Sequence, residues 1–152
     1  MNLSDILSVN CISLDIQGQS KPSVMSEMAQ LAAQSRNVAD VDTLVEALLA
    51  RENIQTTGIG QGIAIPHATA TGVQGLVLSL GICPQGVDFE ALDGQPVNLI
   101  FMLAGEPRLQ TSFLSILSKI SRFFRKADFR NHVLTSESAQ DILSLIKSRE
   151  EL

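Results

Sequence analysis

Apolar and polar positions in the first third of the chain predict one strand followed by two helices. Residues 11–16 alternate apolar and polar side chains and lead to a glycine, which is typical of a β-strand. Apolar residues then recur at helical spacing over residues 20–35 and again over residues 40–51, where Asp40 is the expected N-cap. The two predicted helices therefore follow each other closely.

The remainder of the chain changes from strand patterns to helical ones. Residues 63–65, 76–82 and 97–103 are apolar runs of strand length bounded by glycine and proline. From residue 109 the apolar period becomes helical, and further helices are expected over 127–134 and 138–147, the last capped by Ser136 or Thr135. The predicted order is β-α-α-β-β-β-α-α-α. Strands this apolar need cover on both sides, so we expect an α/β (α+β) fold with helices on both faces of a mixed sheet.

Composition bounds the kind of protein. The chain has 152 residues, of which 45% are hydrophobic and 18% charged. This length suits a single domain, and no apolar run reaches the roughly 20 residues of a membrane span. The N-terminus has no secretory pattern, so we expect a cytoplasmic protein that does not insert into a membrane. A formal charge of −5 argues against a nucleic-acid partner.

Two local features of the sequence are its pair of cysteines and a cluster of basic residues. Cys11 and Cys83 form no CxxC pair, and we expect both to be core thiols. Five cations gather over residues 119–130, a segment that is either a solvated helix face or a docking patch for an acidic partner.

The stretch with the most chemical information is Thr-Gly-Ile-Gly-Gln-Gly-Ile-Ala-Ile-Pro-His, residues 57–67. Glycine permits backbone angles that other residues avoid, and proline fixes its own φ. The predicted strand at 63–65 delivers His67 at its end. A histidine presented in this way is a candidate nucleophile, base or metal ligand.

Several chemistries fit this histidine poorly. A zinc site needs three or four ligands, and the chain offers only His67, His132 and two isolated cysteines, so we expect no metal and no other cofactor. No Gly-x-Ser-x-Gly elbow supports a serine hydrolase, and the glycine pattern lacks the Gly-Lys-Ser/Thr of a phosphate-binding loop. His132 lies among polar residues and is expected at the surface.

Transfer of a phosphoryl group to His67 remains. It requires an accessible imidazole nitrogen, a hydrogen bond that fixes the other nitrogen, and donors for the phosphoryl oxygens. Thr57, Gly58, Gly60 and Gly62 are the candidate binding residues, because a glycine-rich backbone supplies N–H donors. The alternative is a histidine with satisfied hydrogen bonds at the end of a strand.

Residues 57–67 closely resemble the phosphorylation-site motif of IIA components of the bacterial sugar phosphotransferase system, of the fructose and mannitol type, with the nitrogen-regulatory branch nearest. The resemblance extends over residues 3–147. It implies a three-layer α/β/α arrangement around a small mixed sheet, formed by residues 1–152 as one type-2 IIA domain. It also implies that His67 accepts the phosphoryl group from a phosphocarrier protein and that Arg51, in Ala-Leu-Leu-Ala-Arg-Glu, holds the phosphoryl oxygens.

The chain departs from this family at two places. Relatives that transfer phosphate usually carry a second histidine in a pattern like His-Leu-x-Leu-Leu-x-Lys-Leu, and here Phe113 stands in that position. The phenylalanine ring cannot donate a hydrogen bond, and desolvation by it should lower the pKa of His67. Ala68 and Thr69 also occupy positions where relatives often have a basic residue nearby.

Three functions follow from the resemblance. The first is a phosphotransferase component that is phosphorylated on His67 and acts mainly in regulation of the nitrogen, carbon or potassium type. The alternatives are a regulatory protein-binding module with weakened or lost phosphotransfer, and a sugar-specific IIA that passes phosphate to a IIB domain. The expected partners are a histidine-phosphorylated phosphocarrier and either regulatory targets or that IIB domain.

Overall fold

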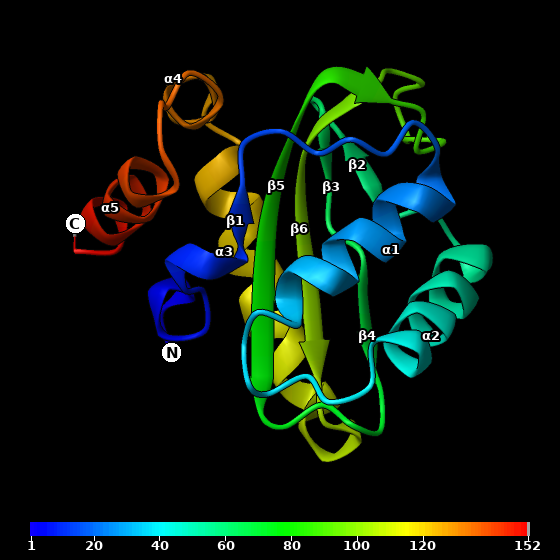
Figure 1. Ribbon diagram of the computed structural model, residues 1–152. Coiled ribbons are helices and arrows are strands. Elements are labelled where there is room, and N and C mark those ends of the chain that lie inside the picture. Colours follow the sequence, from blue (N-terminus) through cyan, green and yellow to red (C-terminus); the bar gives the residue numbers. More distant parts are fainter. Residues whose placement is uncertain (152) are drawn as a thin grey trace.

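A computed structural model describes residues 1–151 and shows a mixed sheet between two helical layers (Figure 1). The sheet runs in the order β1-β5-β6-β3-β2, with β4 also paired to β6. The strands are β1 (Ile12–Ser13), β2 (Gly58–Gly60), β3 (Ile63–Ala64), β4 (His67–Thr69), β5 (Leu76–Val87) and β6 (Val97–Gly105). The long strands β5 and β6 pair antiparallel at the centre, whereas β3 and β4 both run parallel to β6.

The helices divide between the two faces of the sheet. They are α1 (Lys21–Ala32), α2 (Val41–Ile54), α3 (Phe113–Phe124), α4 (Ala127–Leu134) and α5 (Ala139–Glu150), with short 3₁₀ turns η1 (Leu3–Asp5), η2 (Val9–Cys11) and η3 (Pro107–Ser112). Helices α1 and α2 cover one face, and α3, α4 and α5 lie on the other (Figure 1). The predicted three-layer α/β/α class is therefore confirmed.

Alternation along the central strands builds a separate apolar core on each face. Leu78 and Leu80 point toward α3 to α5, whereas Val77 on the same strand joins the core beneath α1 and α2. Ser79 also faces α1, is fully buried, and donates from its hydroxyl to the Met28 carbonyl at 3.1 Å. The hydroxyl of Ser79, the one polar side chain in the run 76–82, thus has its hydrogen bond inside the core.

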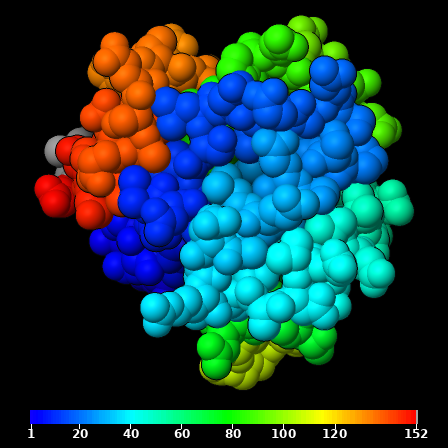
Figure 2. Space-filling view, in the orientation of Figure 1, coloured from blue at the N-terminus to red at the C-terminus, as the bar shows by residue number. Residues whose placement is uncertain are grey.

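The first and last segments of the described chain meet beside η1. Glu150 of α5 accepts hydrogen bonds from the backbone N–H groups of Leu3 and Ser4 and, at 2.8 Å, from the Ser4 hydroxyl. In Figure 2 the N-terminal segment, in dark blue, lies between the red C-terminal helix and the cyan end of α1. This segment therefore joins the two helical layers along one edge of the sheet.

Four expectations about the elements need correction. Five strands, not three, separate α2 from α3, because the glycine-rich segment forms three short strands. The first strand is shorter than predicted and follows η2, and η3 precedes the helix that was expected to begin at residue 109. The N-cap of α5 is Ser138, whose Oγ accepts from the Asp141 N–H at 3.1 Å. Ser136 and Thr135 instead donate to carbonyls of α4 and close that helix.

Candidate functional site

His67 is the first residue of β4 and is held in place by the pairing of this strand with β6. It lies opposite Leu103 of β6, and the Leu103 N–H donates to the Pro66 carbonyl at 3.0 Å. Pro66 cannot donate to the sheet itself, which suits the break between β3 and β4. The break lets the chain leave β3 and pair again with β6 two residues later, with the imidazole at the start of the new strand.

A hydrogen bond within the same loop fixes the imidazole. Its Nδ1 lies 2.8 Å from the Ile65 carbonyl oxygen. A carbonyl can only accept, so Nδ1 carries the proton and, in the neutral ring, Nε2 carries the lone pair. Among residues 1–151 no hydrogen-bond partner is found for Nε2, and the side chain is half-buried. The ring therefore presents a fixed nucleophilic nitrogen.

The surroundings of His67 favour the neutral ring. Burial lowers the pKa of His67 below its usual 6.5, and the positive charge of Arg51 lowers it further. The hydrogen bond to Ile65 and the negative charge of Glu52 act in the opposite direction but do not cancel the effect of burial. The direction agrees with the one expected from the sequence.

Phe113, at the start of α3, packs edge-on against the imidazole. The two ring centroids are 6.0 Å apart and the ring planes are inclined at 78°, a T-shaped arrangement. Phe113 is only 5% exposed and belongs to the core under α3. The ring thus supplies an apolar wall to His67 and offers no polar group to a phosphate.

Gly105 at the end of β6 makes room for this aromatic wall. A Cβ at this position would lie 2.8 Å from Cε1 of Phe113 and 2.9 Å from Cδ2 of Leu76. Both contacts are shorter than van der Waals distances, so a larger residue would displace the ring. Nothing in the sequence pattern identified Gly105 as a support for the site.

Arg51 lies in the last turn of α2, near enough to His67 for its charge to act on the imidazole. Its Nη1 donates to the Gln55 carbonyl at 3.0 Å, which leaves other N–H groups of the guanidinium for a ligand. The side chain is partly exposed. The structure thus brings together three of the predicted site residues, Arg51, His67 and Phe113.

Thr57 is buried and joins the end of α2 to the first strand of the glycine-rich segment. Its N–H and hydroxyl donate to Glu52 at 2.9 and 2.8 Å, and its carbonyl accepts from Ile65 at 3.0 Å. None of these groups is free to bind a ligand directly. The structure gives Thr57 an internal role, and Glu52 is the partner that the sequence did not reveal.

The predicted glycines lie along β2 and the turn that follows it. Gly60 and Gly62 have φ values of +98° and +80°, which explains why glycine stands there. Ile63 is opposite Leu99 and His67 opposite Leu103, so the turn that ends at Ile63 lies four residues, about 13 Å, from the backbone of His67 along β6. A binding role for Gly58, Gly60 and Gly62 stays a prediction, and the site of Arg51, His67 and Phe113 does not depend on it.

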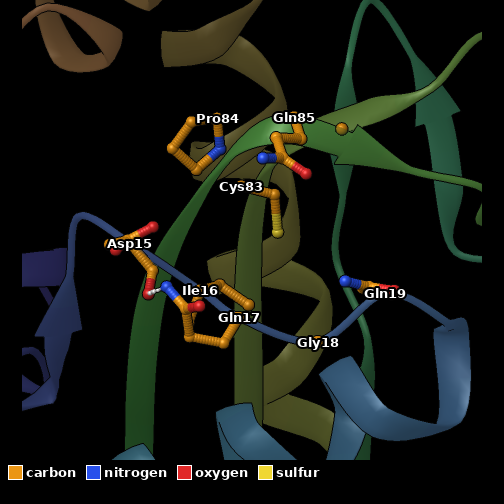
Figure 3. A pocket seen from close by; sticks show the side chains of 9 residues that line it. Asp15, Ile16, Gln17, Gly18, Gln19, Cys83, Pro84 and Gln85 are labelled. Carbon is orange, nitrogen blue, oxygen red and sulfur yellow. Dashed lines mark hydrogen bonds between the residues drawn. The ribbon is translucent and has the colours of Figure 1, made fainter.

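Another hollow lies at the opposite end of β5. Residues 15–19 and 83–86 surround a pocket of about 380 Å³, and the Cys83 side chain points toward the first of these segments (Figure 3). Burial raises the pKa of the Cys83 thiol to about 11, so it stays protonated. Cys11 is buried as well, and both predicted core thiols are confirmed.

The basic segment of α3 and α4 has mixed surroundings. Arg130 donates to the carbonyls of Phe124 and Arg125 at 2.7 and 2.8 Å, which closes the end of α3. Lys119 and Arg122 line a pocket of about 380 Å³ between α3 and α5. His132, expected at the surface, is exposed on α4.

Over residues 1–151 no group of three or more histidine, cysteine, aspartate or glutamate side chains is arranged to hold a metal ion. The same residues contain no helix long and apolar enough to cross a membrane.

Comparison with known proteins establishes the family. Residues 5–149 match the family model described as "Phosphoenolpyruvate-dependent sugar phosphotransferase system, EIIA 2". The chain belongs to this family. Its relatives include both nitrogen regulatory proteins and sugar-specific components.

The chain is 34% identical over 150 residues to the fructose-specific EIIABC component of Bacillus subtilis, 99% of this chain but only 24% of that protein. It is 32% identical to a nitrogen regulatory protein of Pseudomonas aeruginosa, over 96% of this chain and 95% of that one. The crystal structure of nitrogen regulatory protein IIA-Ntr from Neisseria meningitidis superposes with a TM-score of 0.87 at 31% identity, covering 95% of this chain and 98% of the other.

Proposed function

We propose that this protein accepts a phosphoryl group on Nε2 of His67 from a histidine-phosphorylated phosphocarrier, in the cytoplasm, and acts mainly as a regulator. Residues 1–152 would act as one IIA domain. The observation that carries the proposal is the fixed tautomer, since the bond from Nδ1 to the Ile65 carbonyl leaves Nε2 with its lone pair and no partner among the described residues. Burial supports it further by keeping the ring neutral.

The transfer follows from the ring's protonation state. The Nε2 lone pair forms a bond to phosphorus as the bond from phosphorus to the donor's imidazole nitrogen breaks, and that electron pair returns to the donor. His67 keeps its Nδ1 proton during the transfer, so its ring becomes positively charged. The Ile65 carbonyl, which accepts a hydrogen bond from Nδ1 at 2.8 Å, stabilises the charged ring.

The phosphoryl oxygens need positive charge or donors close by. Arg51 is the candidate, because its guanidinium presents several N–H groups in one plane and only one is engaged with Gln55. Phe113 contributes none. With one cation and an apolar wall, the phosphoryl group would be held less firmly than at a site with a second polar ring.

A second polar ring would also donate to the phosphoryl group during its transfer to a IIB domain, so its replacement by Phe113 favours regulation over rapid onward transfer. A phosphate adds about two negative charges beside Arg51, enough to change which protein surfaces bind here. Regulatory targets would then distinguish the two states of His67. The similarity over 95% of a nitrogen regulatory protein supports this role, whereas the fructose-specific relative supports the second candidate, a sugar-specific IIA that passes phosphate to a IIB domain.

The test is phosphorylation of the purified protein by phosphoenolpyruvate, enzyme I and a phosphocarrier, followed by intact mass and acid treatment. We expect one acid-labile phosphoryl group on the wild type and none on His67→Gln. The second histidine offers a matched control, because His132→Gln should be phosphorylated like the wild type. A wild type that takes no label, or a His67→Gln variant that does, would refute the proposal.

Adding a purified IIB domain to the phosphorylated protein separates the two candidate roles. Rapid loss of label to IIB would support the sugar-specific function. Retention of label, together with a partner that binds only one state, would support regulation.

A further inference from the structure

A buried ion pair joins the two helices on the α1/α2 face. The Glu52 side chain of α2 is 3% exposed, and its Oε1 lies 3.0 Å from the ammonium of Lys21, at the start of α1. The Lys21 side chain is 15% exposed, and its ammonium also lies 5.2 Å from the centre of the Phe89 ring. Both charges are thus withdrawn from water, which is costly unless they are paired and hydrogen-bonded.

The remaining hydrogen bonds of Glu52 lead away from the ion pair toward the imidazole. Thr57 donates to the carboxylate from its N–H and its hydroxyl, at 2.9 and 2.8 Å. The Thr57 carbonyl accepts from the Ile65 N–H at 3.0 Å, and the Ile65 carbonyl accepts from Nδ1 of His67 at 2.8 Å. Two hydrogen bonds thus join Thr57 to Glu52, and one hydrogen bond forms each later step, all of normal length.

The same carboxylate also holds the end of α2 that carries Arg51, the cation proposed to bind the phosphoryl oxygens. Arg51 precedes Glu52 in the last turn of α2, so a helix end held by Glu52 holds the backbone of Arg51 too. The helix ends at Ile54, and the chain reaches Thr57 only three residues later. Arg51 and His67 therefore depend for their relative placement on one side chain.

We propose that Lys21 and Glu52 are positioning residues of the phosphoryl-acceptor site, which orient the His67 ring through Thr57 and Ile65 and fix the end of α2 that carries Arg51. This inference rests on the proposed function of His67. Neither residue touches the reacting nitrogen. Replacing Lys21 or Glu52 should therefore change the orientation and protonation of the His67 ring while the protein stays folded.

Neutralising Glu52 and neutralising Lys21 should shift the pKa of His67 in opposite directions. Arg51 and Glu52, both on α2, are the charged groups that act on this imidazole. Glu52→Gln removes a charge that raises the pKa of His67, so the pKa should fall further. Lys21→Met leaves the carboxylate uncompensated, so the pKa should rise. If Lys21 and Glu52 only stabilised the fold, the two substitutions would not shift the pKa of His67 in opposite directions.

Nitrogen-15 NMR of the unphosphorylated protein, labelled at histidine, reads the tautomer and the titration of His67 directly. We expect the wild type to show a protonated Nδ1 and an unprotonated Nε2. Glu52→Gln and Lys21→Met should each mix the two tautomers, shift the titration in the directions above, and slow phosphorylation about tenfold. Lys21→Arg, which keeps the charge, should recover most of the rate.

A matched control is available in Glu90, which lies 3.7 Å from Lys21 but is 80% exposed at its side chain. Glu90→Gln should leave the His67 spectrum and the rate unchanged. If Glu52→Gln does not fold, Lys21→Met and Thr57→Val, which removes only one donor to Glu52, decide the question.

Folded Glu52→Gln and Lys21→Met proteins with the tautomer and titration of the wild type would overturn the proposal. The spectra need no phosphoryl donor, so failure of the wild type to be phosphorylated would refute the proposed function and leave this inference to be judged by the NMR result.

Discussion

Phe113 contributes to both the core and the site, so its truncation should have two separate consequences. Phe113→Ala removes a ring that is 5% exposed, packs in the α3 core and meets the His67 ring at 6.0 Å. Truncation of a buried phenylalanine to alanine costs about 3 to 5 kcal/mol. This side chain lies at the first turn of its helix, where neighbours can relax, so we expect a cost of about 3 kcal/mol.

The expected loss of stability is large enough to measure and should leave Phe113→Ala folded. For a domain of this size, 1 kcal/mol corresponds to a fall in Tm of about 2 to 4 °C, which gives about 6 to 12 °C for Phe113→Ala. At the site, water would reach the imidazole where the ring had excluded it. Because burial is the largest cause of the lowered pKa of His67, that pKa should rise toward 6.5.

Urea unfolding measures the first effect and histidine NMR titration the second. The control is Phe124→Leu, at the other end of the same helix, which is fully buried between Phe101 and Phe129. It should lower stability by about 1 to 2 kcal/mol without moving the titration of His67. A Phe113→Ala protein that loses stability while His67 titrates as in the wild type would show that the apolar wall does not set the protonation of the site.

Other predictions concern the same site and the helix caps. Arg51→Met should slow phosphorylation of His67 by about a hundredfold, whereas it should leave Tm nearly unchanged, as stopped-time labelling and calorimetry would show. The imidazole of His67 should titrate below pH 6.5, so phosphoryl acceptance should persist as pH falls to 6.5 and decline only below it; a midpoint above 6.5 would contradict the effect of burial on this ring. Phe113→His should lengthen the lifetime of the phosphorylated state about tenfold by adding one donor to the phosphate, and an unchanged hydrolysis rate would refute this. Ser138→Ala should cost about 1 kcal/mol in urea unfolding and Ser136→Ala much less, since only Ser138 caps α5.

Hydrophobic patterning predicted most of the fold because the two long strands are buried on both faces and therefore appear in the sequence as continuous apolar runs. The apolar runs at 76–82 and 97–103 form the first parts of β5 and β6, and the spacing of Ile116 and Ile120 places one side of α3 in the core. The short strands were less accessible to this reasoning. The three residues of β2 or of β4 carry too little alternation to reveal a period, and β4 pairs with β6, far away in the sequence.

The site was predicted in part, for a related reason. The motif around His67 indicated a reactive histidine, and the family resemblance indicated Arg51 and the substitution at Phe113. Glu52 and Gly105 were missed because their roles arise from contacts across the fold, with Lys21 of another helix and with the Phe113 ring. A buried carboxylate beside an arginine reads in sequence as an ordinary charged helix end.

The hydrogen bonds from Leu3 and Ser4 to Glu150 hold the two extremities of the folded chain side by side. A polypeptide whose entry and exit points are adjacent can be joined there by a short connector and reopened elsewhere, for example in the exposed turn at Gly94. Such a circular permutant should retain the geometry around the His67 imidazole, because β4 stays paired with β6 and in contact with α2. The same adjacency would let this fold be inserted as a module into a larger polypeptide without pulling its sheet apart.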